Sequence, residues 1–488
     1  MGGWLLPQTK SYFVLRLPHD WFVFGFDNGL DNDIDPQQAA YFANYSKTLP
    51  EAAKVILIQH DPNWVLDQYE ARDRPQKKRT GKRIEFLMNA VLQGKVFLRL
   101  AGDVHNYMRH IPLVAGGGLA DQPPVKIAHE PVSNPTLVVS GGGGAFLHPT
   151  HCLGEDILEG VAGTNGQNYV RAAAYPKADV SAELSWLNLT KFRVRNWRFD
   201  VIGGLTYLLL AHPLFADCTV ENSHSLEAVK NANVWYVFVS FLQDSAVAVG
   251  VMVSSSKLAL FVALCLWLVT VNAVDSGKVG LKFVVGTLHC ASHILCAAAV
   301  NVAIDWLFLS FAAHGTLGQN DLETQWSKFQ VRFPDGAKWL EIAGGWTFGL
   351  VPAVMRYSML IADSPNTQVY IRNEMYCRAS NCADHAGRSD LVVLYWILRA
   401  CWYWVFSCFF VSIIVPAYLW ICLNYLGLHW NEGFSSLQHT GYKNFVRMKI
   451  TKEGKLELYT VGIDKVPSEW VLDPDFVKAA SSEVELVG

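Results

Sequence analysis

Residues 401–426 contain no charged side chain, and this stretch constrains the fold more than any other feature of the sequence. It is rich in Trp, Tyr and Phe, and it exceeds the ~20 apolar residues that a helix needs to cross a bilayer. A buried helix in a soluble core is the alternative, and it accounts poorly for so long an uncharged run. Because helices satisfy their own backbone groups in hydrocarbon, the sequence predicts a membrane-spanning helix here.

Further apolar segments indicate that residues 199–427 form an α-helical transmembrane bundle. Charged residues make up only 17% of the chain, well below the usual quarter of a soluble domain. Residues 258–274 are apolar throughout. Weaker candidates, for which a soluble helical core is the alternative, are residues 201–215, 234–253, 279–311 and 339–361. The sequence therefore predicts about six membrane spans, with the lipid bilayer as a partner.

Basic residues set the predicted orientation of this bundle. Those immediately before the first apolar segment are Lys191, Arg193, Arg195 and Arg198. Because basic residues collect on the cytosolic side of membrane helices, we expect residues 1–198 to be cytosolic. An even number of spans would bring the tail, residues 428–488, to the same side. The glycosylation sequons at Asn44 and Asn188 fall in the part assigned to the cytosol, so we expect both to be unused.

The tail contains a β-hairpin pattern over residues 444–463. Apolar and polar residues alternate on both sides of a polar turn at residues 452–455, which is typical of paired strands with one apolar face. That face consists of Val446, Met448, Ile450, Leu456, Leu458 and Thr460. An isolated hairpin is marginal in water, so we expect it to dock on the N-terminal domain. The alternative is a hairpin on the membrane surface, held to anionic lipid by Lys443, Arg447 and Lys449.

The N-terminal part has the pattern of a mixed α/β domain. Strands are predicted at residues 12–17 and 21–26. Asp35, followed by a proline, is a typical helix N-cap, and a second helix is predicted over residues 83–93 with Gly94 as its stop.

Three more strand-like runs in this part, residues 54–59, 96–101 and 136–140, are followed by ligand-type residues. Those residues are His60, then Asp103 and His105, then His148 and His151 at the end of a glycine-rich turn. In open α/β sheets, ligands bind at the carboxyl ends of the strands. The three strand ends are therefore the predicted location of a site.

Imidazole and carboxylate groups together suit a divalent metal such as Zn, Mn or Fe. We expect His60, Asp103 and His105 to converge in one pocket, with His148 or His151 nearby. For a single histidine, a hydrogen-bonded structural role is the alternative. The net charge of −3 provides no field that would attract nucleic acid, so no nucleic-acid partner is expected.

These motifs together resemble the C-terminal half of a calcineurin-like metallophosphoesterase domain of the large, multi-pass, membrane-anchored eukaryotic type. The resemblance covers most of the chain, at residues 17–21, 33–35, 60–64, 102–107, 141–151, 192–200, 431–436 and 469–474. It implies a partial α/β metallophosphoesterase-like sandwich, followed by the transmembrane bundle and the hairpin tail. It also implies a metal-dependent phosphoesterase, a hydrolase with a phosphoester substrate.

The resemblance further implies roles for single residues. In the superfamily, a lone histidine after a strand and a Gly-His-x-His motif supply ligands to a two-metal centre. By this resemblance His60 matches the lone ligand and His105 the second histidine of the later motif, and these two are the catalytic candidates. Asp103 stands where the first histidine usually does, and His148 and His151 complete the expected metal ligands. Two ions ~3.5–4 Å apart would activate a water and clamp the phosphate.

The sequence also departs from that family. Its first motifs, an Asp-x-His and a Gly-Asn-His-Asp/Glu, are not found before residue 60. We therefore expect a truncated fragment that is inactive by itself. The alternative is a non-catalytic membrane scaffold or sensor with a decayed phosphoesterase-like domain.

Overall fold

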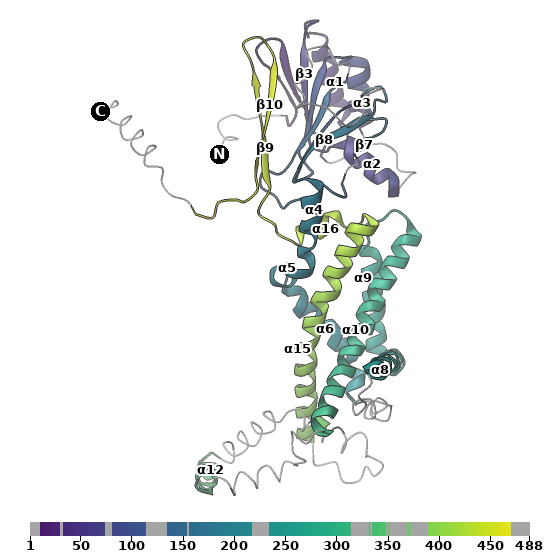
Figure 1. Cartoon of the computed structure of the whole chain (residues 1–488), viewed down its shortest axis with the longest axis vertical. Coiled ribbons are helices and arrows are strands. Elements are labelled where there is room, and N and C mark those ends of the chain that lie inside the picture. Colours follow the sequence, from purple (N-terminus) through teal and green to yellow (C-terminus); the bar gives the residue numbers. More distant parts are fainter. Residues whose placement is uncertain are drawn as a thin grey trace, which may run out of the picture. The chain divides into compact units, whose positions relative to one another are not determined.

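The computed structural model describes residues 10–29, 33–73, 81–113, 134–153, 156–216, 234–313, 334–347 and 389–469, with a few single positions between 331 and 372 (Figure 1). The chain forms two compact units. Unit 1 comprises Met1–Asn188 and Leu419–Gly488, and unit 2 comprises Leu189–Tyr418. Most of the predicted segment 339–361, and all but the first residue of the motif at 469–474, fall outside the described residues.

Within the described residues, unit 1 is built on an eight-stranded mixed sheet with the strand order β1-β2-β3-β4-β6-β5-β8-β7. The strands are β1 (Phe13–Arg16), β2 (Trp21–Gly25), β3 (Lys54–Gln59), β4 (Val96–Ala101), β5 (Tyr107–Pro112), β6 (Thr136–Ser140), β7 (Ile157–Leu158) and β8 (Tyr169–Tyr175). Strands β2, β3, β4 and β6 are parallel to one another, and antiparallel strands flank them on both sides. The carboxyl ends of the four parallel strands therefore lie along one edge of the sheet.

Several helices of unit 1 connect the strands of this sheet, and others follow its last strand. They are α1 (Pro36–Ser46), α2 (Asn63–Asp73), α3 (Lys82–Phe86), the π-helix η2 (Leu87–Val91), α4 (Ala178–Ser185), the π-helix η6 (Cys422–Leu426) and α16 (Trp430–Ser435). Asp35 caps α1 as predicted, because its Oδ1 accepts the backbone N–H groups of Gln37 and Gln38 at 2.7 and 2.9 Å. The predicted helix at 83–93 is confirmed, with a change to π-helical geometry from Leu87. Phe42 of α1 packs into the aromatic core formed by the sheet.

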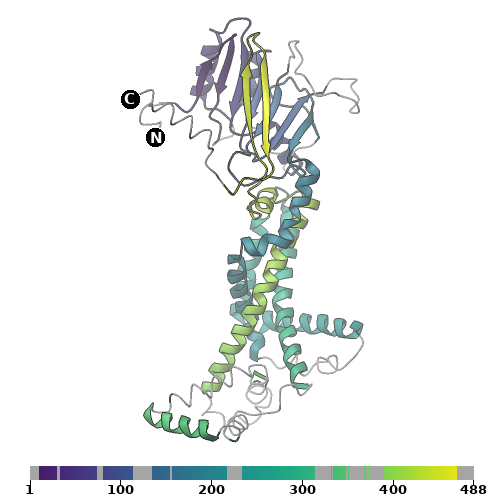
Figure 2. The ribbon, with the colours of Figure 1, turned by 60° about the vertical axis from the view of Figure 1, so that its left-hand side comes forward.

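The C-terminal hairpin packs on the sheet of unit 1, as the alternation of its residues predicted. Strands β9 (Lys443–Ile450) and β10 (Leu456–Ile463) pair antiparallel, and the yellow ribbon in Figure 2 shows them across the sheet. Four of their apolar side chains, Val446, Ile450, Leu456 and Leu458, join a cluster around Trp21. The Trp21 indole N–H also donates a hydrogen bond to the Gly454 carbonyl at 3.1 Å. Docking on the N-terminal domain is therefore confirmed.

Unit 2 is helical. Its helices are α5 (Leu187–Arg195), which begins at the end of unit 1, α6 (Arg198–Ala211), the 3-10 helix η3 (His212–Ala216), α8 (Val234–Ser255), α9 (Lys257–Ala273), α10 (Val279–Ala313), α12 (Pro334–Trp346) and α15 (Ser389–Ile421). Among the described residues, four helical segments are long and apolar enough to cross a membrane: Arg198–Ala216, Val234–Ser255, Val279–Phe308 and Val392–Leu426. Helix α9 is apolar but shorter.

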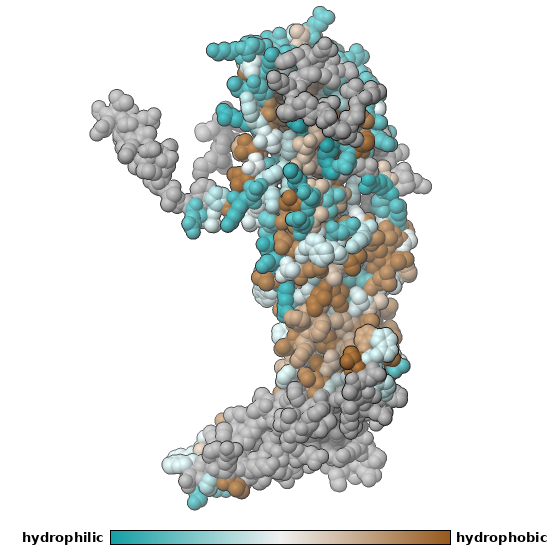
Figure 3. All heavy atoms as spheres, in the orientation of Figure 1, coloured by the Kyte–Doolittle hydropathy of each residue, from teal (hydrophilic) through white to brown (hydrophobic). Residues whose placement is uncertain are grey.

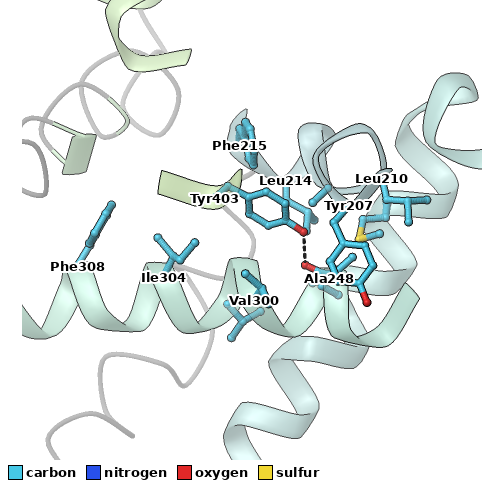
Figure 4. Close-up of a cluster of buried hydrophobic side chains, with 14 of the residues drawn as sticks. Tyr207, Leu210, Leu214, Phe215, Ala248, Val300, Ile304, Phe308 and Tyr403 are labelled. Atoms are coloured by element: carbon cyan, nitrogen blue, oxygen red, sulfur yellow. Dashed lines mark hydrogen bonds between the residues drawn. The ribbon is translucent and has the colours of Figure 1, made fainter. Parts of the chain in front are cut away.

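The helices of unit 2 bury a core of aromatic and small side chains and leave other apolar side chains on the surface. The core includes Tyr207, Phe215 and Tyr403, whose hydroxyl donates to the Ala297 carbonyl at 2.8 Å (Figure 4). Brown, hydrophobic residues cover much of the visible face of these helices (Figure 3). Phe261 of α9, for example, is 63% exposed. An apolar surface of this extent is typical of a protein surrounded by lipid.

Candidate metal centre

Loops from neighbouring parallel strands are tied together at the carboxyl edge of the sheet. The backbone N–H groups of Gly102 and Asp103, after β4, both donate to the His60 carbonyl, after β3, at 3.1 Å. The side-chain oxygen of Asn28, after β2, accepts the His60 backbone N–H at 2.8 Å. These hydrogen bonds fix the backbone of His60, and they hold the loops after β3 and β4 next to each other.

Three side chains converge at this edge. His60, Asp61 and Asp103 each offer one ligand atom, and these atoms lie within 4.8 Å of one another. His60 Nδ1 is 2.5 Å from Asp61 Oδ1, and His60 Nε2 is 4.0 Å from Asp103 Oδ1. One imidazole and two carboxylates form a donor set that suits Zn, Mn or Fe. His60 is exposed, so an ion could reach the group from solvent.

Asp61 provides a test of whether these residues fit a cation. Its carboxyl group is buried, and within the described part of the chain its Oδ2 atom has no hydrogen-bond partner. Burial raises the pKa of Asp61, while the hydrogen bond to His60 acts in the opposite direction. A buried carboxylate oxygen without a partner is costly, and a bound cation would compensate for it. The residues present therefore fit a divalent ion.

The structure pairs His105 with His148 rather than with the three-residue group. Their rings stack with centroids 4.1 Å apart and planes 13° apart. His148 Nδ1 accepts the His105 backbone N–H at 3.0 Å, so the ring proton is on Nε2, which lies 3.2 Å from Asn431 Oδ1. Burial lowers the pKa of His148 to about 3, so this ring is neutral near pH 7. Both nitrogens of His148 are thus engaged with protein atoms.

His151 is engaged with helix α4. The Ser181 hydroxyl accepts the Thr150 backbone N–H at 3.0 Å, and it shares a hydrogen bond of 2.8 Å with His151 Nδ1. Burial lowers the pKa of His151. His151 is not a member of the three-residue group. Of the five predicted site residues, the structure therefore brings two, His60 and Asp103, into one group of potential ligands.

The glycine-rich turn allows the loops after β6 and β4 to approach closely. A Cβ atom on Gly141 would lie 1.7 Å from the Gly102 carbonyl oxygen and 2.4 Å from that of Val104. Both obstacles are backbone atoms, so no side-chain movement could make room. The first glycine of the turn therefore supports the loop that carries Asp103.

Sequence reasoning missed two residues of this site. Asp61 directly follows His60, but the sequence does not show that the carboxylate turns back toward the imidazole. Asn28 follows a strand that was predicted, and its position at a parallel strand end is the signal that could have identified it.

Comparison with known proteins adds no family to this description. No family model, curated protein or solved structure matches the chain.

Proposed function

We propose that the chain is a membrane-anchored, metal-dependent phosphoesterase-type protein. In this proposal unit 1 binds a divalent ion through His60, Asp61 and Asp103, and the apolar helices of unit 2 anchor it in a bilayer. One observation carries the proposal: three ligand-type side chains converge at the carboxyl edge of parallel strands, and one of them has a buried carboxylate oxygen with no hydrogen-bond partner among the described residues. The motif resemblance to metallophosphoesterases supplies the substrate class.

The chemistry follows from this edge of the sheet. A divalent ion bound there would present positive charge to a phosphoryl oxygen. His105 follows two residues after Asp103 and is the candidate proton acceptor. Burial lowers its pKa, with Asp103 opposing the shift, so the imidazole is neutral near pH 7 and able to accept a proton from water.

The same geometry supports a second candidate function. Among the described residues, one group of three or more potential ligands is present, whereas a two-metal centre needs a second set. A single ion lacks the paired clamp by which a two-metal centre stabilises both the attacking and the leaving oxygen of a phosphoester. A non-catalytic sensor that binds a phosphoester through one ion is therefore the alternative, and we expect this chain by itself to hydrolyse phosphoesters slowly or not at all.

Manganese binding to the full chain in detergent tests the proposal. We expect about one Mn²⁺ per chain by electron paramagnetic resonance, and Asp61→Asn or Asp103→Asn to weaken binding by about tenfold or more, since even outer-shell changes cost 10–100-fold. Asp179→Asn, an exposed carboxylate on α4, is the matched control and should bind normally. Binding that is unaffected by the two site variants would refute the metal centre.

Phosphoester turnover then separates the two candidate functions. The substrate is a generic phosphodiester such as bis(p-nitrophenyl) phosphate, with the Mn²⁺-loaded chain and its His105→Ala variant. Hydrolysis that depends on Mn²⁺ and on His105 supports the phosphoesterase. Metal and phosphate binding without hydrolysis supports the sensor.

The proposed location is a membrane, with the soluble parts on its cytosolic side. The two segments on either side of the apolar helices, Met1–Asn188 and Leu419–Gly488, belong to unit 1. Basic residues precede the first apolar helix. The side chain of Asn188 is buried, and its amide donates to the carbonyls of Ser185 and Gly433, which leaves no room for a glycan. Glycan attached to Asn44 would refute this orientation.

A further inference from the structure

Two histidines lie on one face of an apolar helix in unit 2. His289 and His293 are four residues apart on α10, within the segment Val279–Phe308 that is long enough to cross a membrane. Their Nε2 atoms are 3.1 Å apart. Ionisable residues inside such segments are costly, and they usually mark a functional site. The phosphoesterase proposal gives this pair no role.

Two neighbouring helices hold the histidine rings in place. The hydroxyl of Tyr207, on α6, lies 2.7 Å from His293 Nδ1, and both residues are buried. The ring of Tyr418, on α15, stacks on that of His289 with centroids 3.7 Å apart and planes 10° apart. Figure 4 shows Tyr207 within the core of the bundle. Contacts from two helices thus direct the two Nε2 atoms toward one point.

We propose that His289 and His293 bind a late first-row transition-metal ion, such as Zn²⁺ or Cu²⁺, inside the helical bundle. Two nitrogens that each lie about 2.0–2.1 Å from one ion at a tetrahedral angle are about 3.3 Å apart, close to the spacing observed. Paired histidines at positions i and i+4 of a helix are an established zinc-binding arrangement. Imidazole ligands favour Zn, Cu and Ni over Mg and Ca.

Tyr207 fits the role of a residue that orients a metal ligand. If His293 Nδ1 carries the proton and donates it to the Tyr207 oxygen, the Nε2 lone pair is available to an ion. Two protein ligands leave coordination positions open, which water or a small anionic ligand would fill. The competing explanation is that the two imidazoles only share a hydrogen bond, and the experiment distinguishes the two.

The test uses Cu²⁺ and the full chain in detergent, purified without a polyhistidine tag. His60→Ala and Asp103→Asn are introduced together to remove the site in unit 1, so the outcome is independent of the proposed function. We expect one Cu²⁺ per chain whose paramagnetic resonance spectrum shows coupling to two imidazole nitrogens. His289→Ala and His293→Ala should each abolish this signal, while His212→Ala, which alters a half-buried histidine of the same unit outside the pair, should preserve it.

A second variant keeps the test decisive if an alanine variant does not fold. Tyr207→Phe retains both imidazoles, so we expect the two-nitrogen spectrum with about 10–100-fold weaker affinity. A spectrum without nitrogen coupling in the folded parent chain overturns the proposal. So does a two-nitrogen signal that persists in folded His289→Ala and His293→Ala chains.

Discussion

Asp61 contacts His60 through Oδ1, and its other carboxylate oxygen, Oδ2, is buried without a hydrogen-bond partner in the part of the chain that the structure describes. Burial raises the pKa of this carboxyl in the folded chain above its unfolded value, so the folded protein binds the proton more tightly. The stabilisation from this group is therefore fully present at low pH, and it is lost as the pH rises through the folded pKa. A bound cation would offset this loss, because it favours the ionised form.

We predict that Asp61→Asn removes this pH dependence. At pH 7 the metal-free variant should unfold at the same temperature as the metal-free parent chain or higher, and Mn²⁺ should no longer stabilise it. Thermal unfolding of the chelator-treated proteins between pH 4 and 7 measures this. A metal-free variant that is clearly less stable than the parent at pH 7 would show that Asp61 has a structural role instead.

Gly141 is a second residue at which a single substitution tests the structure, because the backbone approaches closely there. We predict that Gly141→Ala destabilises unit 1 by about 1–3 kcal/mol, because the added methyl group would overlap backbone carbonyl oxygens. Gly143 lies in the same turn, and a Cβ atom added there would have no other atom within 4 Å, so Gly143→Ala is the control. Equal unfolding temperatures for the two variants would contradict the close approach of the loops.

At the residue scale, the sequence indicated which side chains were candidates for the site, but it did not indicate what those side chains contact. His60 and Asp103 could be named in advance because each follows a strand with a clear apolar pattern. His148 and His151 follow the same kind of signal, yet they bond to Asn431 and Ser181. Side-chain direction in a loop depends on distant segments, and no local pattern carries that information.

At the scale of elements, the alternating apolar residues of the hairpin β9–β10 form one face that packs against the cluster around Trp21. We predict that Trp21→Phe, which keeps an aromatic ring but removes the indole N–H, weakens hairpin docking by about 0.5–1.5 kcal/mol, the usual value of one hydrogen bond. Faster proteolysis at residues 451–455 measures the weaker docking. Tyr459→Phe, on the exposed side of β10, should leave proteolysis unchanged. Identical rates for all three chains would argue against docking through Trp21.

Strands and helices with a clear periodic pattern of apolar residues were predictable, and those without such a pattern were not. Strands β2, β3, β4 and β6 and the hairpin follow from apolar runs and alternation. Strand β8 contains three consecutive alanines, which favour a helix, and it is a strand because it pairs with β5. The π-helical turn η2 likewise has no local signature.

At the scale of the whole molecule, the division into a sheet unit and a helical unit was predictable from charge and apolar patterning. Four of the six expected membrane segments are long apolar helices, and a fifth is the shorter helix α9. Strand order was not predictable, because pairing such as β4 with β6 joins residues that are far apart in the chain.

We predict that the two soluble segments of the chain lie on the same side of a membrane. Single cysteines placed at Asp179 and Lys452 in a chain without exposed native cysteines should react alike with an impermeant thiol reagent in sealed vesicles. The physical reason is that both positions belong to unit 1. Labelling of one position and protection of the other would contradict this arrangement.

The discontinuous make-up of unit 1 has a consequence for biosynthesis. The ribosome completes the sheet early, then makes all of Leu189–Tyr418, and only afterwards supplies the hairpin that covers Trp21. Until then an apolar face of the nascent domain is open to chaperones and to aggregation. A chain that stalls before these strands are made would leave this face uncovered, so the nascent domain depends on chaperones for as long as the synthesis of Leu189–Tyr418 takes.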